Sequence, residues 1–243
     1  MELNGKVALV TGAARRVGRA IALALASRGA ILAVHYRNSA AQAAETIATI
    51  EAAGGVARAF HADLEKISDI QAMVNSVAAA FGRLDILVNS ASVFYRKPLE
   101  ELSERDWDMN LDTNLKAPFF AAKFAGAIMR RQGAGKIVNI GDSAGIRPYN
   151  NYLPYTVSKS ALIGLTQALA KALAPQVQVN CLAIGPVLRP EDYSAEQIEG
   201  LARSTLTKRL GTPQDVARAV LFLCETDFAT GATLVLDGGR LIA

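Results

Sequence analysis

Short apolar segments alternate with longer amphipathic segments along the whole chain, and this alternation limits the possible folds more than any other feature. Segments with a helical pattern lie between apolar runs of strand length. The expected strands are Val7–Val10, Ile31–His35, Ala57–Phe60, Ile86–Val88, Lys136–Ile140, Val177–Cys181 and Thr233–Leu236. Such alternation predicts an α/β fold, in which a doubly wound parallel sheet is joined by right-handed crossovers.

The helical patterns and the chain length favour a single domain. Helical patterns are clear over Ala40–Ala52, Ile67–Phe81 and Pro213–Cys224. The 243 residues are enough for one α/β domain with a large core, and they contain no repeat, low-complexity stretch or linker. We therefore expect one domain over residues 1–243. The polar segment Leu188–Lys208, rich in Glu, Arg, Ser and Thr, has the character of an insertion.

Composition excludes several classes of function. Hydrophobic content of 51% with 20% charged residues argues against disorder. The net charge is only +4 and no basic block is present, so a nucleic-acid partner is not expected; a polyanionic cofactor explains the small excess. The first residues lack an apolar signal region, and no apolar run approaches a membrane span, so we expect a cytoplasmic protein without membrane contact. Cys181 and Cys224 lie in apolar runs and are expected as buried free thiols, and no metal spacing is present.

The first motif is a glycine turn behind the first strand. The run Thr-Gly-Ala-Ala-Arg-Arg-Val-Gly at 11–18 separates Val7–Val10 from a helical pattern that ends near Gly29, a C-terminal cap. Gly12 permits the tight turn, and Gly18 permits close packing of the helix on the strand. A glycine turn between a strand and a helix is the setting in which a helix N-terminus binds a cofactor pyrophosphate.

The second motif is a tyrosine–lysine pair with an acid upstream. Tyr155 and Lys159 are four residues apart and share one face of a helix, and Asp142 precedes the tyrosine by thirteen residues. An ammonium beside a phenol favours the phenolate, so we expect Lys159 to lower the tyrosine pKa from about 10. Such a tyrosine can exchange a proton with a substrate. Alone, this short pattern fits a buried tyrosine and a solvated lysine on an ordinary amphipathic helix better.

Together the two motifs resemble the short-chain dehydrogenase/reductase family, which pairs a TGxxxGxG turn with a YxxxK helix. The resemblance covers essentially the whole chain, in order. It implies the strand order 3-2-1-4-5-6-7, a mobile substrate loop near 188–208, and a homotetramer formed through the helices that contain Asn114 and Tyr155. Asp63 and Leu64 match the family's adenine site, and Asn89 and Ala91 match the segment after the fourth strand. Asn114 matches the structural and proton-relay asparagine. Gly185 and Pro186 match the turn that meets the nicotinamide, and Leu236–Gly239 matches the closing strand.

Two departures from the family pattern narrow the resemblance. Arg16 stands where the family usually has glycine, and Asp142 stands where it usually has serine. In both positions the chain is similar to pteridine reductases and to bacterial dihydromonapterin or dihydrofolate reductases. The segments 35–40 and 91–95 also resemble theirs, and in the second of these a phenylalanine stacks on the pterin. This implies a substrate site of Arg16, Ser92, Phe94, Asp142 and Tyr155. A solvated Arg16 and a lid-packing Phe94 are the alternatives, and the four features that point to one subfamily weigh against them.

The end of the second strand indicates the cofactor. An acid there would bind the ribose 2′-hydroxyl of NAD, but the run His-Tyr-Arg-Asn-Ser at 35–39 has none. Arg37 and Ser39 can donate to a 2′-phosphate, with Arg16 as a second cation, so we predict NADPH. The expected cofactor-binding residues are Gly12, Arg16, Val17, Gly18, His35, Arg37, Ser39, Asp63, Leu64, Asn89, Ala91, Tyr155, Lys159, Gly185 and Pro186.

The resemblance implies a reductase that transfers hydride from NADPH to a C=N bond of a pterin or folate-type substrate. Phe94 would stack on the ring, Tyr155 would donate the proton, and Lys159 would also hold the nicotinamide ribose. Asp142 could supply protons, since an aspartic acid with a raised pKa can be an acid near neutral pH, or it could simply cap the next turn. Two alternatives stay open. One is a carbonyl or 3-oxoacyl reductase, and the other is an NADPH-binding sensor with a vestigial site. The presence of Tyr155, Lys159 and Asn114 argues against the sensor, because a protein that only binds the cofactor has little need of all three.

Overall fold

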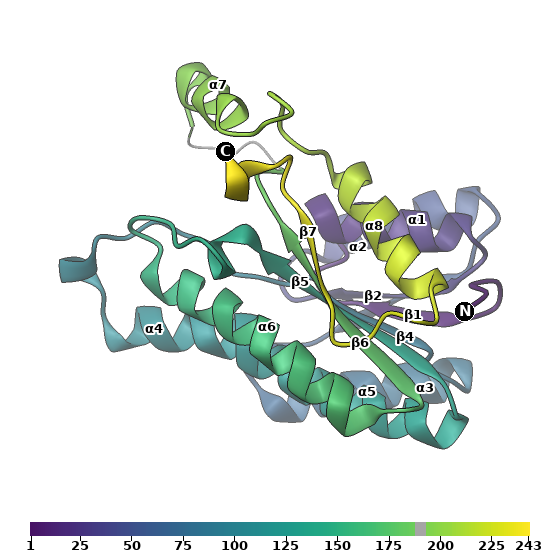
Figure 1. Ribbon diagram of the computed structural model, residues 1–243. Helices are drawn as coiled ribbons and strands as arrows, with labels where there is room; N and C mark the ends of the chain where they lie inside the picture. Colours follow the sequence, from purple (N-terminus) through teal and green to yellow (C-terminus); the bar gives the residue numbers. More distant parts are fainter. Residues whose placement is uncertain (188–192) are drawn as a thin grey trace.

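Seven parallel strands form one sheet in the order β3-β2-β1-β4-β5-β6-β7, which confirms the predicted topology (Figure 1). The computed structural model describes residues 1–187 and 193–243. The strands are β1 (Val7–Val10), β2 (Ile31–Tyr36), β3 (Ala57–His61), β4 (Ile86–Asn89), β5 (Gly135–Asp142), β6 (Val177–Ile184) and β7 (Thr233–Leu236). β5 and β6 run farther than predicted, and Asp142 is consequently the last residue of β5.

Helices cover both faces of the sheet, as the apolar strands require (Figure 1). One face carries α1 (Arg16–Ser27), α2 (Ala40–Ala52) and α8 (Pro213–Glu225), and the other carries α3 (Ile67–Phe81), α4 (Glu104–Leu111), α5 (Ala117–Gln132) and α6 (Leu153–Leu173). Residues of β1 alternate between the two cores: Ala8 and Val10 pack in the first, and Val7 and Leu9 in the second. All four are fully buried.

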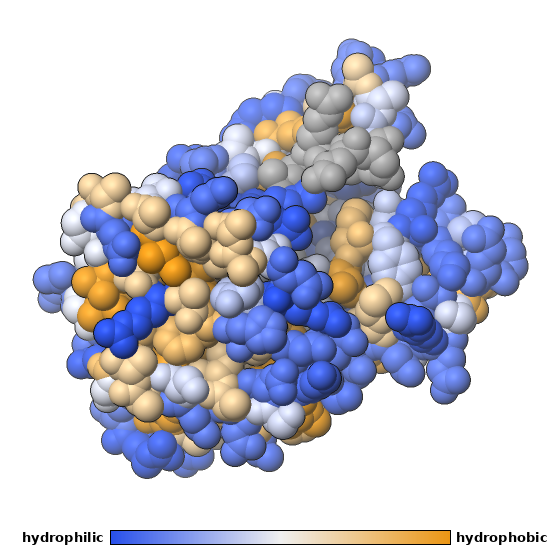
Figure 2. Space-filling model, turned by 180° about the vertical axis from the view of Figure 1, so that it is seen from behind, coloured by the Kyte–Doolittle hydropathy of each residue, from blue (hydrophilic) through white to orange (hydrophobic). Residues whose placement is uncertain are grey.

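The local signals at helix ends and cysteines are confirmed. α1 is followed by Gly29 at φ +81°, whose N–H donates to the carbonyl oxygen of Ala26 at 2.9 Å. α2 and α3 have the predicted bounds, and α8 extends one residue beyond them. Cys181 and Cys224 are buried free thiols. Seen from behind, polar residues spread over much of the surface with apolar patches between them (Figure 2).

The loops at the carboxyl edge of the sheet build the region that matters for function. α7 (Ala195–Arg203) and the C-terminal turn Arg240–Ile242 both lie beyond this edge (Figure 1). The predicted substrate loop near 188–208 is described from residue 193 onward, and its residues 188–192 lie outside the described part. Within the described residues, no helix combines the length and apolar character needed to cross a bilayer.

Candidate active site

Two adjoining pockets open at the carboxyl edge of the sheet. The smaller, about 550 Å³, is lined by the glycine turn and the end of β2; the larger, about 1320 Å³, is lined by the ends of β5 and β6, the α7 region and the C-terminus. Both are lined by Arg16, Val17, Phe94, Tyr155 and Ile184, which form their common wall. Ligands of open α/β sheets bind at this edge.

The glycine turn forms a close-fitting backbone cradle in the smaller pocket. A Cβ at Gly18 would lie 2.3 Å from the carbonyl oxygen of Gly12, so only glycine lets α1 approach the turn. Gly12 has φ +68°, and a Cβ there would lie 3.1 Å from Cα of Ala91. Arg16, at the start of α1, has φ +53°, a left-handed conformation that favours the glycine usual in the family. Backbone N–H groups at such a turn fit a pyrophosphate.

His35 supports the glycine turn and also lines the smaller pocket. Its Nδ1 accepts from the Gly12 N–H at 2.9 Å, and Nε2 lies 3.2 Å from the carbonyl oxygen of Ala62, to which it donates in that tautomer. Both ring nitrogens are therefore engaged, and the side chain is 2% exposed. Burial lowers the pKa of His35 from 6.5 to about 4, so the ring is neutral at physiological pH.

This burial predicts a pH-dependent stability. Because the pKa of His35 is lower in the folded than in the unfolded state, the neutral ring contributes fully to the free energy of unfolding above pH 6.5. This contribution is lost as the pH falls toward 4. The full shift corresponds to about 3 kcal/mol. Unfolding by urea between pH 7 and 4 should show this loss in the wild type and a flatter profile in His35→Gln. His61→Gln, which changes the other histidine of the chain, should keep the wild-type slope; equal slopes in all three proteins would contradict the assignment.

Thr11 is a functional residue that the sequence interpretation missed. Its Oγ1 accepts from the N–H groups of Ser90 at 2.9 Å and Ala91 at 3.0 Å, and the side chain is 2% exposed. The hydroxyl thus ties the loop after β4 to the glycine turn and places Ala91 in the smaller pocket. A threonine that directly follows a buried strand and precedes a glycine was the available signal.

Two acidic side chains that follow β3 reach the predicted 2′-phosphate site. Arg37 and Ser39 line the smaller pocket together with Leu64. The Arg37 guanidinium is 2.6 Å from Glu65 Oε1 and 3.3 Å from Asp63 Oδ1. The sequence argument considered only the residues after β2, whereas parallel pairing ends β3 at the same edge. The site is therefore not free of acids, and the adenine role of Asp63 stays a prediction.

The two predicted asparagines are structural in this arrangement. Asn89 donates to Asn139 Oδ1 at 2.8 Å inside the core and lines neither pocket, and its cofactor contact stays a prediction. Asn114 lies in a π-helical turn, Asp112–Lys116. Its amide bonds both backbone groups of Val93, at 2.9 and 3.0 Å, and reaches the hydroxyls of Ser92 and Ser158. Asn114 thus fixes the loop after β4 against α6.

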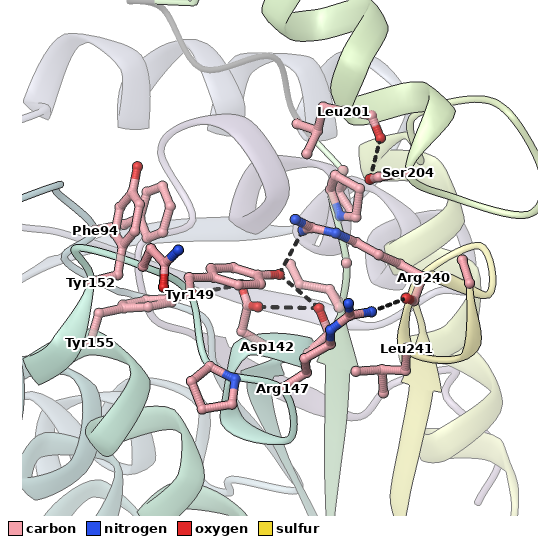
Figure 3. Close-up of a pocket in the computed structure, with 18 of the residues that line it drawn as sticks. Phe94, Asp142, Arg147, Tyr149, Tyr152, Tyr155, Leu201, Ser204, Arg240 and Leu241 are labelled. Atoms are coloured by element: carbon pink, nitrogen blue, oxygen red, sulfur yellow. Dashed lines mark hydrogen bonds between the residues drawn. The ribbon is translucent and has the colours of Figure 1, made fainter.

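Tyr155, Asp142 and Lys159 are brought together as the motif predicts. The Tyr155 hydroxyl donates to Asp142 Oδ2 at 2.7 Å (Figure 3). Asp142 Oδ1 accepts from the Ala144 N–H at 2.7 Å. Asp142 therefore also caps the turn Ser143–Gly145. The Lys159 ammonium donates to the carbonyl oxygen of Ile140 at 2.9 Å and lies 5.6 Å from the centre of the Tyr155 ring. All three side chains are buried.

The predicted direction of the tyrosine shift is wrong in this structure. Burial, and then the neighbouring Asp142 carboxylate, raise the pKa of Tyr155 well above 10, and the lysine bonds a backbone carbonyl instead of the phenol oxygen. Burial also lowers the pKa of Lys159 and raises that of Asp142, although hydrogen bonds to the carboxylate oppose the latter shift. Tyr155 is therefore a neutral donor, and Asp142 holds its proton to higher pH than an ordinary aspartate.

Aromatic residues line the junction of the pockets. Phe94 is 48% exposed and stacks on Tyr152, with ring centres 4.5 Å apart and planes at 10°. Its ring meets Tyr155 edge-on at 4.7 Å. Gly185 and Pro186 line the larger pocket, and a Cβ at Gly185 would lie 2.6 Å from Cα of Asp237. Tyr149 and Arg240, which meet in the larger pocket, carried no sequence signal because 91 residues separate them.

Known proteins share this fold and its full length. A family model described as enoyl-(acyl carrier protein) reductase matches residues 12–240. The chain is 38% identical to D-threitol dehydrogenase of Mycolicibacterium smegmatis, with 99% of this chain and 94% of that protein covered. It is 35% identical to 3-oxoacyl-[acyl-carrier-protein] reductase FabG of Staphylococcus aureus, with 96% and 97% covered.

Solved structures agree closely. A blue fluorescent protein from a metagenomic library, in complex with NADPH, has a TM-score of 0.92 at 34% identity, with 99% of both chains covered. A short chain dehydrogenase from Burkholderia cenocepacia, in complex with NADP, has a TM-score of 0.92 at 36% identity, with 99% of this chain and 100% of that chain covered. None of these four names is a pteridine reductase. With its strand order, glycine turn and paired Tyr155 and Lys159, the chain belongs to the short-chain dehydrogenase/reductase family, whose members are nicotinamide-dependent oxidoreductases.

Proposed function

We propose that this protein is an NADPH-dependent reductase of a pterin-type ring, in which a C=N bond is reduced. The observation that carries this proposal is the buried Asp142–Tyr155 hydrogen bond, which joins a carboxyl group of raised pKa directly to the proton donor. The serine usual in the family can orient a carbonyl but cannot supply a proton near neutral pH. An aspartic acid can, and a ring nitrogen needs a proton when its carbon receives hydride.

The smaller pocket suits a dinucleotide phosphate. The glycine turn would hold the pyrophosphate, and Arg37 and Ser39 lie where a 2′-phosphate would be bound. Lys159 faces the same pocket next to Tyr155 and would hold the nicotinamide ribose. When bound, the cofactor supplies the hydride. The two solved relatives that contain NADPH or NADP support this choice of cofactor.

The chain's own residues provide the proton and the platform. Tyr155 would pass its hydroxyl proton to the substrate nitrogen. Asp142, when protonated on Oδ2, would then donate to the Tyr155 oxygen across the same 2.7 Å contact, which is the reverse of the direction seen in the structure. Tyr152 covers one face of Phe94, so a flat substrate ring would stack on the other, exposed face. Ser92 is tied to Asn114, and its predicted substrate contact would act from that anchored position.

Carbonyl reduction is the second candidate, and the names of the relatives favour it. The names 3-oxoacyl-[acyl-carrier-protein] reductase and D-threitol dehydrogenase both describe the interconversion of a carbonyl group and an alcohol. Both proteins match nearly the whole chain. Neutral Tyr155 could protonate a carbonyl oxygen as well as a ring nitrogen. The two candidates differ in what they require of Asp142.

A substrate panel separates these candidates. NADPH oxidation would be followed with dihydropterins, quinonoid pterins, dihydrofolate and acetoacetyl thioesters. We expect turnover of at least one pterin or folate. Efficient reduction of a keto substrate without pterin turnover would establish the second candidate. Binding of NADPH with no turnover of any compound would favour the sensor function.

A homotetramer remains part of this proposal. Exposed apolar side chains on α4, α5 and α6, namely Trp107, Phe119 and Val157, support an interface on the helices that the family resemblance names. Light scattering in solution measures the assembly.

Glu65 gives a testable prediction about cofactor preference. Its carboxylate competes with a 2′-phosphate for Arg37 and repels that phosphate. Glu65→Gln should therefore tighten NADPH binding by about two- to fivefold, as expected for an exposed pair, and leave NADH binding nearly unchanged. Fluorescence titration with both cofactors measures this, and Glu51→Gln, an exposed acid at the end of α2, is the matched control. Weaker NADPH binding in Glu65→Gln would show that Glu65 instead orients Arg37 productively.

A further inference from the structure

The lining of the larger pocket is strongly basic. Five arginines and one lysine line it: Arg16, Arg96, Arg147, Arg203, Arg240 and Lys208. Among its described lining residues, Asp142 is the single acidic side chain. Because Asp142 is buried against Tyr155, it does not neutralise the wall on the far side of the pocket. A pocket with this balance of charge favours an anionic ligand.

Arg240 packs on Tyr149, and Arg147 contacts the backbone of Arg240. The Arg240 guanidinium carbon lies 4.7 Å from the centre of the Tyr149 ring, and Nη1 donates to the Tyr149 hydroxyl at 3.0 Å. Arg147 Nη1 donates to the backbone carbonyl oxygen of Arg240 at 3.3 Å, so both residues line the same part of the pocket (Figure 3). We name Arg147, Tyr149 and Arg240 the arginine cluster.

The arginine cluster adjoins the reaction centre. The Tyr149 hydroxyl is 2.8 Å from Ser143 Oγ, and Ser143 directly follows Asp142 in the chain. Burial, and then the neighbouring Asp142 carboxylate, raise the pKa of Tyr149, whereas Arg240 opposes this shift. A substrate whose reacting bond lies at Tyr155 would therefore extend its next substituent toward Arg147 and Arg240.

Within the described residues, the guanidinium groups of the cluster have no carboxylate partner, unlike those of Arg203 and Arg37. Arg203 pairs with Glu199 at 2.9 Å, and Arg37 pairs with Glu65. Across residues 1–187 and 193–243, no carboxylate lies within ion-pair distance of Arg147 or Arg240; their contacts there are a carbonyl, a hydroxyl and a ring face. A guanidinium with such partners keeps donors available, and its fork matches a carboxylate or a phosphate.

We propose that the arginine cluster binds an oxyanion, a carboxylate or a phosphate, carried by the substrate beside the bond that is reduced. This inference rests on the proposed function only in taking the larger pocket as the substrate site. It names a substrate class that either candidate reaction could have: a negatively charged pterin or folate, or a keto compound with an acidic group.

Direct binding tests the cluster without any turnover. Calorimetric titrations with benzoate, phenyl phosphate and benzamide compare ligands that share a ring and differ in charge, with and without NADP⁺. We expect at least one anion to bind about tenfold more tightly than benzamide, the scale of one charge-assisted hydrogen bond. The tighter of the two anions distinguishes a carboxylate from a phosphate.

Variants locate the binding. The double change Arg147→Gln with Arg240→Gln should weaken the preferred anion about tenfold or more and leave benzamide unchanged. Arg203→Gln removes the same charge from the same pocket wall, but its guanidinium is already paired, so we expect less than a twofold effect. Arg240→Lys keeps the charge and should retain much of the affinity. If the double variant fails to fold, Arg147→Gln alone replaces it in the titrations, because the Arg147 side chain is exposed.

Matched substrates separate the cluster from the reaction. Dihydrofolate is compared with uncharged dihydrobiopterin, and acetoacetate with methyl acetoacetate; the pair that is reduced identifies the chemistry. In that pair, the double variant should lower the ratio of kcat/KM between anionic and neutral substrate about tenfold. If no pair is reduced, the proposed function fails while the calorimetry still decides the cluster. Equal binding of benzamide and both anions, or anion binding unaffected in the double variant, would overturn the inference.

Discussion

Tyr155→Phe should lose nearly all turnover while NADPH binding stays largely intact. The change removes one hydroxyl, the group that donates to Asp142 Oδ2, and leaves the buried ring in place. Loss of a positioned proton donor typically costs 10²–10⁴-fold in rate. Steady-state kcat and a fluorescence titration with NADPH measure the two effects separately. Melting curves would accompany them, because the change leaves a buried carboxylate oxygen without its donor, at a cost of about 1–3 kcal/mol.

Lys159→Ala provides the contrast for this experiment. Its ammonium lies between the Ile140 carbonyl and the Tyr155 ring and lines the smaller pocket. We therefore expect Lys159→Ala to weaken NADPH binding as well as turnover. If Tyr155→Phe kept most of its activity, the proton would come from another group and the proposed mechanism would be wrong.

The sheet could be predicted because its strands are buried on both faces. β1 is apolar at every position, since alternate residues enter opposite cores, and this leaves a continuous run in the sequence. The end of β5 could not be predicted in the same way. Gly141 and Asp142 break the apolar run of β5 although they remain paired with β6, because the site needs a polar side chain there.

The active site was predictable where its residues are close in sequence. Tyr155 and Lys159 share a helix face, and the glycine turn follows a strand, so local spacing placed both. The sign of the tyrosine pKa shift was not predictable, because it depends on burial and on which atom Lys159 bonds. Arg240 reaches Tyr149 and Glu65 reaches Arg37 through tertiary packing alone, and no spacing rule connects them.

The substitution at position 142 decides between the two candidate reactions. Asp142 uses Oδ1 to cap the turn after β5 and Oδ2 to hold Tyr155, so capping and acid chemistry share one carboxylate. Asp142→Asn keeps the shape and a capping oxygen but cannot donate an acidic proton. Asp142→Ser keeps a cap and restores the residue usual in the family. If Asp142 relays the proton, both variants should lower kcat for a pterin by 10²–10⁴-fold, and Asp142→Ser could gain carbonyl activity.

The pH dependence of kcat distinguishes this relay from a purely structural role for the carboxyl group. Burial raises the pKa of Asp142, so its proton-carrying form persists above the ordinary aspartate range and is lost as pH rises through the raised value. Wild-type kcat for a pterin should therefore fall on the alkaline side of that pKa, and this limb should be absent from the residual activity of Asp142→Asn. A carboxylate that only caps the turn predicts the opposite: Asp142→Asn would keep most of the pterin activity and the wild-type profile. In that case Tyr155 would act without the acid, and carbonyl reduction would become the better account of the site.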